Sequence, residues 1–365
     1  MLARVHKAIL AADGWLPFDQ FMALALYEPG LGYYANQQPK FGSMPQSGSD
    51  FVTAPELSPL FGATLAQQVA QALKATGTDE VWEFGAGSGA LAHQLLGELQ
   101  RLGCPLKRYN IMDLSSSLKA RQQAKLAEYG DQVQWLTQWP ASLQGVVVGN
   151  EVLDAMPVKL LHRVKGVWHE RGVVAANLAS HPEGLAWEDR PTNLRPPLEP
   201  VGDHDYLTEI QPQGEAFVAS LAERLLASDK GGAAFFLDYG FPESEYFHPE
   251  RHMGTVMCHQ AHKADTNPLA EVGLKDITAH VNFTGIALAG QDAGLHVLGY
   301  TSQARFLLNL GLAERMSASD LAERAQAMKL ISEHEMGELF KVVGFATHDH
   351  WQAQGFAAGD RSHRL

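Results

Sequence analysis

From residue 80 onward, short apolar runs alternate with longer segments in which apolar residues recur every three or four positions. Short apolar runs are typical of buried strands, and the wider spacing is typical of amphipathic helices. The pattern predicts two helices, over 90–102 and 116–129, set between strands over 81–84, 108–113, 133–136 and 145–149. Strands that alternate with helices in this way indicate a doubly wound parallel α/β sheet, whose ligands bind beyond the carboxyl ends of the strands.

The segment before this pattern predicts an N-terminal helical or lid region over residues 1–78. Residues 1–28 favour two helices, and a loop rich in Gly, Ser, Pro and Gln follows over 36–49. Loops of this length are usually functional lids or disordered segments. Ser58 is a typical N-cap residue for the next helix, which we expect to end at Gly77.

The alternation then breaks for some fifty residues. Residues 159–174 favour a hairpin and 177–198 are irregular, so we expect an inserted β-rich element over 158–210 that serves as a substrate platform or a dimer contact. Residues 79–157 form the first, Rossmann-like half of the sheet, and 211–365 complete it with inserted helices. The later elements are predicted as helices over 213–228, 302–310 and 318–331 and strands over 232–237, 295–300 and 341–346.

Composition narrows the functional classes. The 365 residues carry a net charge of −13 without a basic run, which argues against nucleic acid as a main partner. No apolar run reaches the roughly 20 residues that span a bilayer, and the first residues lack the apolar core of a signal peptide. The two cysteines, Cys104 and Cys258, fit a reducing compartment. We therefore expect a cytoplasmic protein without a membrane span.

No metal site is expected. The two cysteines have no metal-ligand spacing, and the sixteen histidines are scattered. Asp276 and His280 would share one face if their segment were helical, but no third ligand accompanies them, so a structural pair is the better interpretation.

The most informative stretch joins the first predicted strand to the first predicted helix. Glu83 ends the strand, and Gly85, Gly87 and Gly89 form a turn whose backbone N–H groups can approach a ligand because side chains do not block the way. A dinucleotide site needs Gly-x-Gly-x-x-Gly or Ala, and Ala90 supplies the last position. An acid at the strand end suits a cationic cofactor such as S-adenosylmethionine, whereas a pyrophosphate gains nothing from it. The stretch therefore favours S-adenosylmethionine, with a dinucleotide or mere close packing as alternatives.

Two further strand ends carry polar side chains. Asp113 ends the second strand, where an acid would bond the ribose hydroxyls of either nucleotide class. Asn150, Glu151 and Asp154 follow the strand over 145–149, and one helical turn would place the two acids on the same side. A pair of acids suits a guanidinium, which offers a fork of donors. The alternative interpretation is a solvated turn with a helix cap.

Five motifs occur together and in order along the chain: LY through GYY at 26–34, GSDFVTAPE at 48–56, EFGAGSG at 83–89, NEVLDAMPV at 150–158 and DITAHV at 276–281. This set resembles the family of S-adenosylmethionine-dependent methyltransferases that includes the mitochondrial complex I assembly arginine methyltransferase and its bacterial relatives. The resemblance covers nearly the whole chain. It implies a class I, Rossmann-like methyltransferase sheet with an N-terminal helical cover and inserted elements. The mitochondrial relatives in this family methylate an arginine of a respiratory-complex subunit.

On this resemblance, we expect methyl transfer from S-adenosylmethionine to an arginine side-chain nitrogen of a protein substrate. The glycine turn would cradle the amino-acid end of the cofactor, an acid would bond its ribose, and part of the second motif would close over it. The paired acids would orient the guanidinium and stabilise its charge. The expected site residues are, for the cofactor, Glu83, Gly85, Ala86, Gly87, Gly89, Asp113, Thr53, Pro55 and Glu56, and, for catalysis, Glu151, Asp154 and Asn150.

Two other functions stay open at this point. One is an NAD-dependent dehydrogenase, against which Glu83 and the later motifs argue. The other is a non-catalytic assembly factor that keeps the fold as a docking surface, and the acidic net charge fits this function as well as it fits an enzyme. The expected partner is a protein with an exposed arginine, and the chain could form a homodimer.

Overall fold

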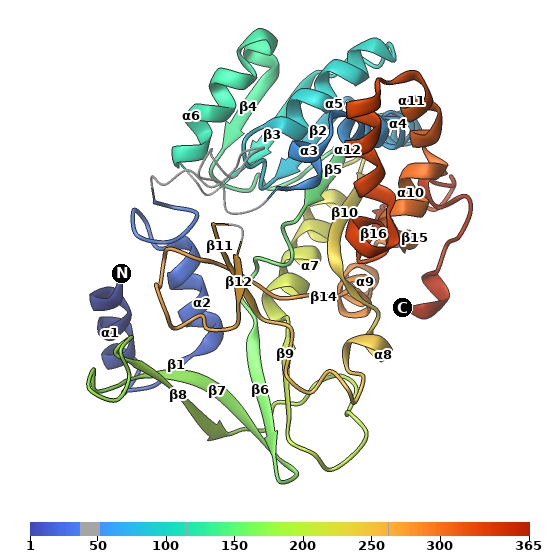
Figure 1. Ribbon diagram of the computed structural model, residues 1–365. Coiled ribbons are helices and arrows are strands. Elements are labelled where there is room, and N and C mark those ends of the chain that lie inside the picture. Colours follow the sequence, from blue (N-terminus) through green and yellow to red (C-terminus); the bar gives the residue numbers. More distant parts are fainter. Residues whose placement is uncertain (37–51, 114–115, 262) are drawn as a thin grey trace.

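The computed structural model describes residues 1–36, 52–113, 116–261 and 263–365 (Figure 1). Its largest sheet has eight strands. In sheet order they are β15 (His296–Ser302), β16 (Phe340–Ala346), β10 (Gly232–Phe241), β5 (Gly145–Asn150), β2 (Glu80–Phe84), β3 (Arg108–Met112) and β4 (Val133–Leu136), with β14 (Val281–Asn282) pairing beside this row with β10. The strands from β10 to β4 run parallel, and β16 runs antiparallel to both of its neighbours.

Strand β5 lies in the middle of this sheet and is buried on both faces. Val146 and Val148 pack with helices on one face, Val147 packs with helices on the other, and all three are fully buried. The helices of the first face are α4 (Pro59–Thr76), α5 (Ala90–Arg101), α10 (Gln303–Asn309), α11 (Leu312–Ala318) and α12 (Leu321–Ile331), and those of the second are α7 (Pro212–Leu226) and α9 (Phe283–Asp292). A strand covered on both faces is a continuous apolar run, which is how β5 was recognised in the sequence.

Two smaller sheets lie beyond the main one (Figure 1). The second sheet is antiparallel and contains β1 (Leu16–Pro17), β7 (Val167–Ala175), β6 (Lys159–Val164), β9 (Tyr206–Ile210) and β8 (Leu185–Pro191). The third sheet contains β12 (Lys263–Asp265), β11 (Met257–Gln260) and β13 (Asp276–Thr278). Helices α1 (Leu2–Ala11) and α2 (Phe18–Tyr27) pack on the second and third sheets through one apolar cluster that includes Phe21, Val173 and Ile277.

Most of the predicted elements are confirmed, and helix α4 shows why. Its N-cap Ser58 accepts a hydrogen bond from the Leu60 N–H at 3.3 Å, and its C-cap Gly77 takes the left-handed conformation with φ of 64°. The predicted hairpin is the pair β6–β7. Local cap and turn chemistry therefore fixed these elements.

One expectation about local structure is wrong, and two pairs of residues that a helical turn would have aligned do not lie in a helix. The segment over 177–198 is not irregular throughout, because it contains β8, which pairs along most of β7. Asp276 lies on strand β13 and His280 follows it, so they are not a helical pair. Glu151 and Asp154 lie in a turn rather than a helix.

The remaining helices are short or lie at the edge of the sheet. Helix α6 (Ser116–Lys125) lies near β3 and β4, and is shorter than predicted; α3 (Ala54–Leu57) and α8 (Glu243–Tyr246) are single turns. Residues 37–49 of the predicted loop over 36–49 lie outside the described residues. Within the described part of the chain, no helix is long and apolar enough to cross a membrane.

Candidate active site

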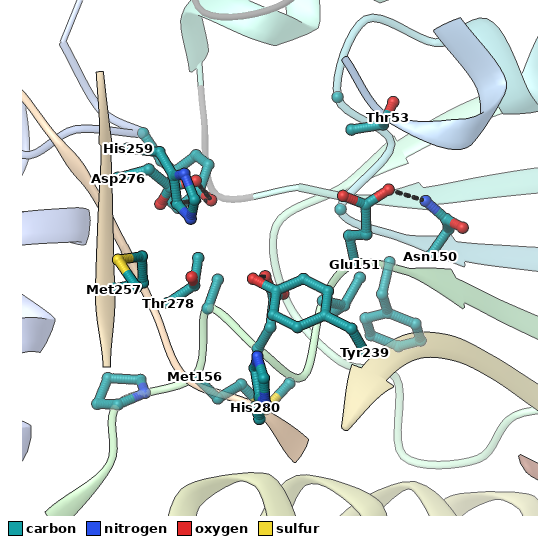
Figure 2. Close-up of a pocket in the computed structure, with 18 of the residues that line it drawn as sticks. Thr53, Asn150, Glu151, Met156, Tyr239, Met257, His259, Asp276, Thr278 and His280 are labelled. Atoms are coloured by element: carbon teal, nitrogen blue, oxygen red, sulfur yellow. Dashed lines mark hydrogen bonds between the residues drawn. The ribbon is translucent and has the colours of Figure 1, made fainter. Parts of the chain in front are cut away.

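A cavity of about 1280 Å³ lies at the carboxyl ends of β2, β3, β5 and β10. Its opposite wall comes from the helix α2 region and from strands β11 and β13, so the cavity is bounded by the main sheet on one side and the third sheet on the other. Figure 2 shows this arrangement, with Glu151 on one wall, Asp276 on the other, and the ring of Tyr239 between them. The position agrees with the rule for open parallel sheets.

The glycine turn forms the end of the cavity above β2. Gly85, Gly87 and Gly89 all have positive φ, of 66°, 53° and 81°. A Cβ on Gly85 would lie 3.0 Å from Cγ2 of Val152, so a side chain here would strain the backbone and require this neighbour to shift. Gly89 does not line the cavity; it is the N-cap residue of α5 and packs against Gln122.

Glu83 lies just before the turn and is almost completely buried. The hydroxyl of Tyr109 donates a hydrogen bond of 2.7 Å to Oε2 of Glu83. Burial raises the pKa of Glu83 to about 8, and this hydrogen bond opposes that rise. A cation placed here would stabilise the ionised carboxylate, which fits the amino group of a methionine-derived cofactor.

Asp113 is the acid at the end of β3, and the structure ties it to the glycine turn through Gln122. The Gln122 side-chain amide donates to Oδ2 of Asp113 at 2.8 Å and to the carbonyl of Gly87 at 3.0 Å, and its oxygen accepts from the Trp135 indole at 3.0 Å. The sequence analysis missed Gln122, which is fully buried on α6. No local motif marks it, because its partners lie on three different elements.

Helix α3 and its N-cap Thr53 lie over the glycine turn. Thr53, Pro55 and Glu56 line the cavity, and the carbonyl of Pro55 accepts a hydrogen bond of 2.8 Å from Gln94 of α5. The Ser88 hydroxyl donates to Glu56, which joins the helix directly to the turn. Ala86 completes this side of the cavity and is itself buried.

The turn after β5 places Asn150 and Glu151 beside the glycine turn. Glu151 has a φ of 54°, which a non-glycine residue rarely adopts, and its N–H donates to the Leu237 carbonyl at 2.9 Å. Its Oε1 accepts a hydrogen bond of 3.0 Å from Asn150 (Figure 2). Burial, and then the charge of Asp154, raise the pKa of Glu151 to about 8. Among the described residues, Oδ1 of Asn150 has no hydrogen-bond partner.

Asp154 lies deeper along the same wall. Tyr239 donates a hydrogen bond of 2.6 Å to its Oδ2, while its Oδ1 is buried without a partner in the described part of the chain. Burial raises the pKa of Asp154 to about 6, and the Tyr239 hydrogen bond opposes this rise. A buried carboxylate oxygen without a donor is costly unless a ligand supplies one.

Asp238 explains why this turn is not helical. Its Oδ2 accepts three successive backbone N–H groups, from Val152, Leu153 and Asp154, at 3.1, 2.9 and 3.2 Å. The three amides therefore share one acceptor on β10, and the side chains of Glu151 and Asp154 line the cavity. All predicted site residues except Gly89 therefore line one cavity.

Comparison with known proteins identifies the family. Residues 64–301 match the family model described as S-adenosyl-L-methionine-dependent methyltransferase. The chain belongs to this family. A crystal structure of a Burkholderia thailandensis protein bound to S-adenosyl-homocysteine superposes with a TM-score of 0.93, is 46% identical, and is matched over 100% of this chain and 96% of that chain.

More distant relatives carry a specific name. The protein arginine methyltransferase NDUFAF7 of Danio rerio is 27% identical over 92% of this chain and 86% of its own length, and the Caenorhabditis elegans homologue is 25% identical over 90% and 80%. The methyltransferase prediction, its cofactor and its fold are therefore confirmed. Neither NAD-dependent oxidation nor a purely docking function is favoured by these comparisons.

The expectation of a cytoplasmic protein is contradicted. The relatives from Danio rerio, Caenorhabditis elegans and Drosophila melanogaster are all named mitochondrial. Cysteine usage and the absence of a long apolar run do not distinguish the cytoplasm from the interior of an organelle, which is why the sequence led to the wrong expectation.

Proposed function

We propose that this S-adenosylmethionine-dependent methyltransferase transfers a methyl group to a side-chain nitrogen of an arginine in a protein. The observation that carries the proposal is the pair Glu151–Asp154, two carboxylates held on one wall of the cavity beside the glycine turn. A guanidinium would bring a positive charge and several donors in one plane to this pair of carboxylates. The names of the NDUFAF7 relatives support the same acceptor.

The residues around the glycine turn fit S-adenosylmethionine. The turn at Gly85 disfavours a side chain, Glu83 offers a buried acid for an amino group, and Asp113 offers an acid for ribose hydroxyls. When bound, the cofactor supplies the methyl group as the electrophilic carbon of a sulfonium. Thr53 and Glu56 would close this half of the cavity, because α3 is already joined to the turn through Ser88.

The chain's own groups then orient the acceptor and take its proton. Asp154 would hold the guanidinium, and Glu151, whose Oε1 accepts a hydrogen bond from Asn150, would face the reacting nitrogen. The nitrogen forms the new N–C bond as the S–C bond breaks, and the proton that it loses passes to the carboxylate of Glu151. Alignment of the nucleophile and exclusion of water account for most of the acceleration of such a transfer.

Methyl transfer from a labelled cofactor to arginine-containing peptides tests the proposal, with lysine in place of arginine as the control. We expect label only on the arginine peptides. Glu151→Gln should lower turnover by about a hundredfold, as expected when a proton acceptor is lost, and should leave the affinity for S-adenosylhomocysteine nearly unchanged. Equal transfer to both peptides, or equal loss of turnover and cofactor affinity, would contradict the assignment.

Two broader expectations belong to the same proposal. We expect the second sheet, over 158–210, to contribute to substrate binding or to a homodimer contact, since residues such as Arg171 and Trp187 of this sheet line the far end of the cavity. We expect no nucleic acid partner because of the acidic net charge. Chromatographic mass measurement and binding of the acceptor protein would test these expectations.

A further inference from the structure

Arg251 is a cation of the cavity that the mechanism above does not use. Among the described residues that line the cavity, the arginines are Arg171 and Arg251, and none is a lysine. Arg171 is already paired, because its guanidinium donates to both oxygens of Asp189 at 2.7 and 2.9 Å. No hydrogen bond or ion pair joins the Arg251 guanidinium to another residue in the described part of the chain.

The guanidinium of Arg251 is nevertheless held in place. It lies over the ring of Phe241, with its Cζ 3.7 Å from the ring centroid. The face of an aromatic ring attracts a cation, and a guanidinium keeps five N–H donors in its own plane for a second partner. Two of these donors match the two oxygens of a carboxylate. The ring therefore positions the cation and leaves its donors available.

The segment that carries Arg251 is fastened to strand β9. The Tyr206 hydroxyl donates to the carbonyl of His248 at 3.0 Å, and the Leu207 N–H donates to the carbonyl of His252 at 2.9 Å. Between these points, the Arg251 N–H donates to the His248 carbonyl at 2.9 Å. The backbone on both sides of Arg251 is thus fixed, and the place of its side chain does not depend on a free loop.

This segment lies at the mouth of the cavity. Met253, two residues beyond Arg251, lines the cavity and is 77% exposed. A residue with both properties lies where the cavity opens to solvent. An exposed methionine is an adaptable apolar contact for a partner chain. A substrate protein would therefore pass these two residues on its way to the paired acids.

Aromatic rings separate Arg251 from the acids of the acceptor site. His280 contacts Phe241 on one side and Tyr239 on the other, with ring centroids 5.3 Å apart in each case, and Tyr239 is the hydrogen-bond donor to Asp154 (Figure 2). The cavity is therefore acidic at the acceptor site and cationic at its mouth. An arginine that reaches the acids would present a neighbouring residue of its own chain to Arg251.

We propose that Arg251, seated on Phe241 at the mouth of the cavity, is a specificity residue that binds a carboxylate of the substrate close in sequence to the methylated arginine. This inference rests on the proposed function, because it names the kind of sequence in which the acceptor arginine lies. Arg251 binds the substrate and takes no part in proton transfer.

Calorimetric titration of peptides into protein saturated with S-adenosylhomocysteine tests this assignment without turnover. The probes are amidated peptides with one central arginine among neutral residues, in which a single Glu replaces Gln at each of the four positions on either side. At one or two adjacent positions, Glu should improve binding about fivefold over the all-Gln peptide, as a well-placed ion pair at a partly exposed site does. The net charge of −13 opposes such a preference, so a local cation must supply it.

A carboxylate could also come from the end of a chain. An all-Gln peptide that stops at the favoured position, with either a free carboxylate or an amide, distinguishes this source from a Glu side chain. Tighter binding of the free carboxylate alone, with no effect of Glu at any position, would keep Arg251 as the carboxylate binder and assign the carboxylate to a chain end.

Arg251→Gln should remove the preference for the carboxylate, and Arg251→Lys, which keeps the charge and loses the planar fork, should retain about a twofold preference. The matched control is Arg190→Gln. Arg190 also lies over an aromatic ring, with its Cζ 5.0 Å from the centroid of Trp15, but it pairs with Glu188 and is not among the described residues that line the cavity. The preference should stay at the wild-type value in this control.

An all-Gln peptide with citrulline in place of arginine separates the two proposals, because citrulline keeps the shape and removes the charge. Equal binding of the arginine and citrulline peptides by wild type would overturn the arginine acceptor. A wild type that prefers arginine but gains nothing from any carboxylate, or whose preference for the carboxylate survives in Arg251→Gln, would leave the acceptor standing and overturn the role of Arg251 alone.

Discussion

The hydroxyl of Tyr239 lies 2.6 Å from Oδ2 of Asp154 and donates a short hydrogen bond to it. The two residues come from neighbouring strand ends, β10 and β5, and are 85 positions apart in the chain. Because one carboxylate oxygen is held by this bond, the orientation of the Asp154 side chain, which lines the cavity, is fixed. Tyr239 is thus a positioning residue for the acceptor site.

Tyr239→Phe should lower kcat/KM for an arginine peptide by about tenfold or more, because a hydrogen bond to a charged group contributes about 1.5–3 kcal/mol. Without the hydroxyl, Asp154 is free to rotate and its pKa rises further. The affinity for S-adenosylhomocysteine should not change. Steady-state kinetics beside calorimetric titration would check both; a variant that loses only cofactor affinity would contradict the assigned role.

Asp238→Asn should disturb the same site through the backbone. The amide nitrogen of asparagine cannot accept hydrogen bonds, so either the three N–H groups of residues 152–154 or that of Tyr239 would lose their acceptor. We expect a loss of about 1–3 kcal/mol in the free energy of unfolding. Turnover should fall at least as far as in Tyr239→Phe, and an unchanged kcat in a destabilised protein would show that the turn keeps its shape without Asp238.

The sequence predicted the part of the site that follows from the topology of a parallel sheet. Glu83, Asp113 and Glu151 end or follow strands β2, β3 and β5, whose carboxyl ends meet at one edge, so their convergence needed only the strand–helix alternation. The cap residues Ser58 and Gly77 were equally readable, because cap chemistry is local.

The opposite wall could not be predicted in this way. Tyr34 and Asp276 are 242 positions apart and meet only because α2 and β13 pack in one apolar cluster outside the main sheet. The conformation of Glu151 was missed for a similar reason: the spacing to Asp154 fits a helical turn, but Asp238 draws the three amides out of it. Such long-range hydrogen bonds override local periodicity.

Gly85→Ala should abolish cofactor binding while costing little stability. The new Cβ would lie 3.0 Å from Val152, at a φ of 66°, and would narrow the cradle that the cofactor needs. Gly77→Ala is the matched control, since Gly77 has a φ of 64° but open space around it. Each variant should lose roughly 1 kcal/mol in unfolding free energy because of its positive φ, and Gly85→Ala should lose somewhat more because Val152 must shift. Titration with S-adenosylhomocysteine should detect binding only in the control; binding by both would move the cofactor away from this turn.

Glu83→Gln should stabilise the ligand-free protein at alkaline pH. The folded-state pKa of Glu83, about 8, exceeds the unfolded value of 4.5, so the fold favours the protonated acid and loses stability as the pH rises through this window. The difference in unfolding free energy between variant and wild type should grow by roughly 2–4 kcal/mol from about pH 5 to 9. Urea denaturation at several pH values measures it.

Glu98→Gln is the control for that experiment. Burial acts to raise the pKa of Glu98, but its bonds to Arg101 and Arg315 together outweigh burial and lower the pKa, so its carboxylate stabilises the fold above the unfolded pKa. This variant should be less stable than wild type by a constant amount across the same window. A difference that grows equally in both variants would point to groups other than Glu83.

The pH dependence of kcat/KM for an arginine peptide should report the carboxylates of the acceptor site. Asp154 and Glu151 have pKa values raised to about 6 and about 8, chiefly by burial, and a guanidinium needs both ionised. Because the two groups interact, the apparent values belong to the pair.

At saturating cofactor, which keeps Glu83 out of the profile, kcat/KM should rise between about pH 6 and 8 and then level. In Glu151→Gln the upper part of this rise should disappear and the lower part remain. If the profile keeps its shape in the variant, Glu151 does not titrate in the free enzyme, and another group of the cavity accepts the proton.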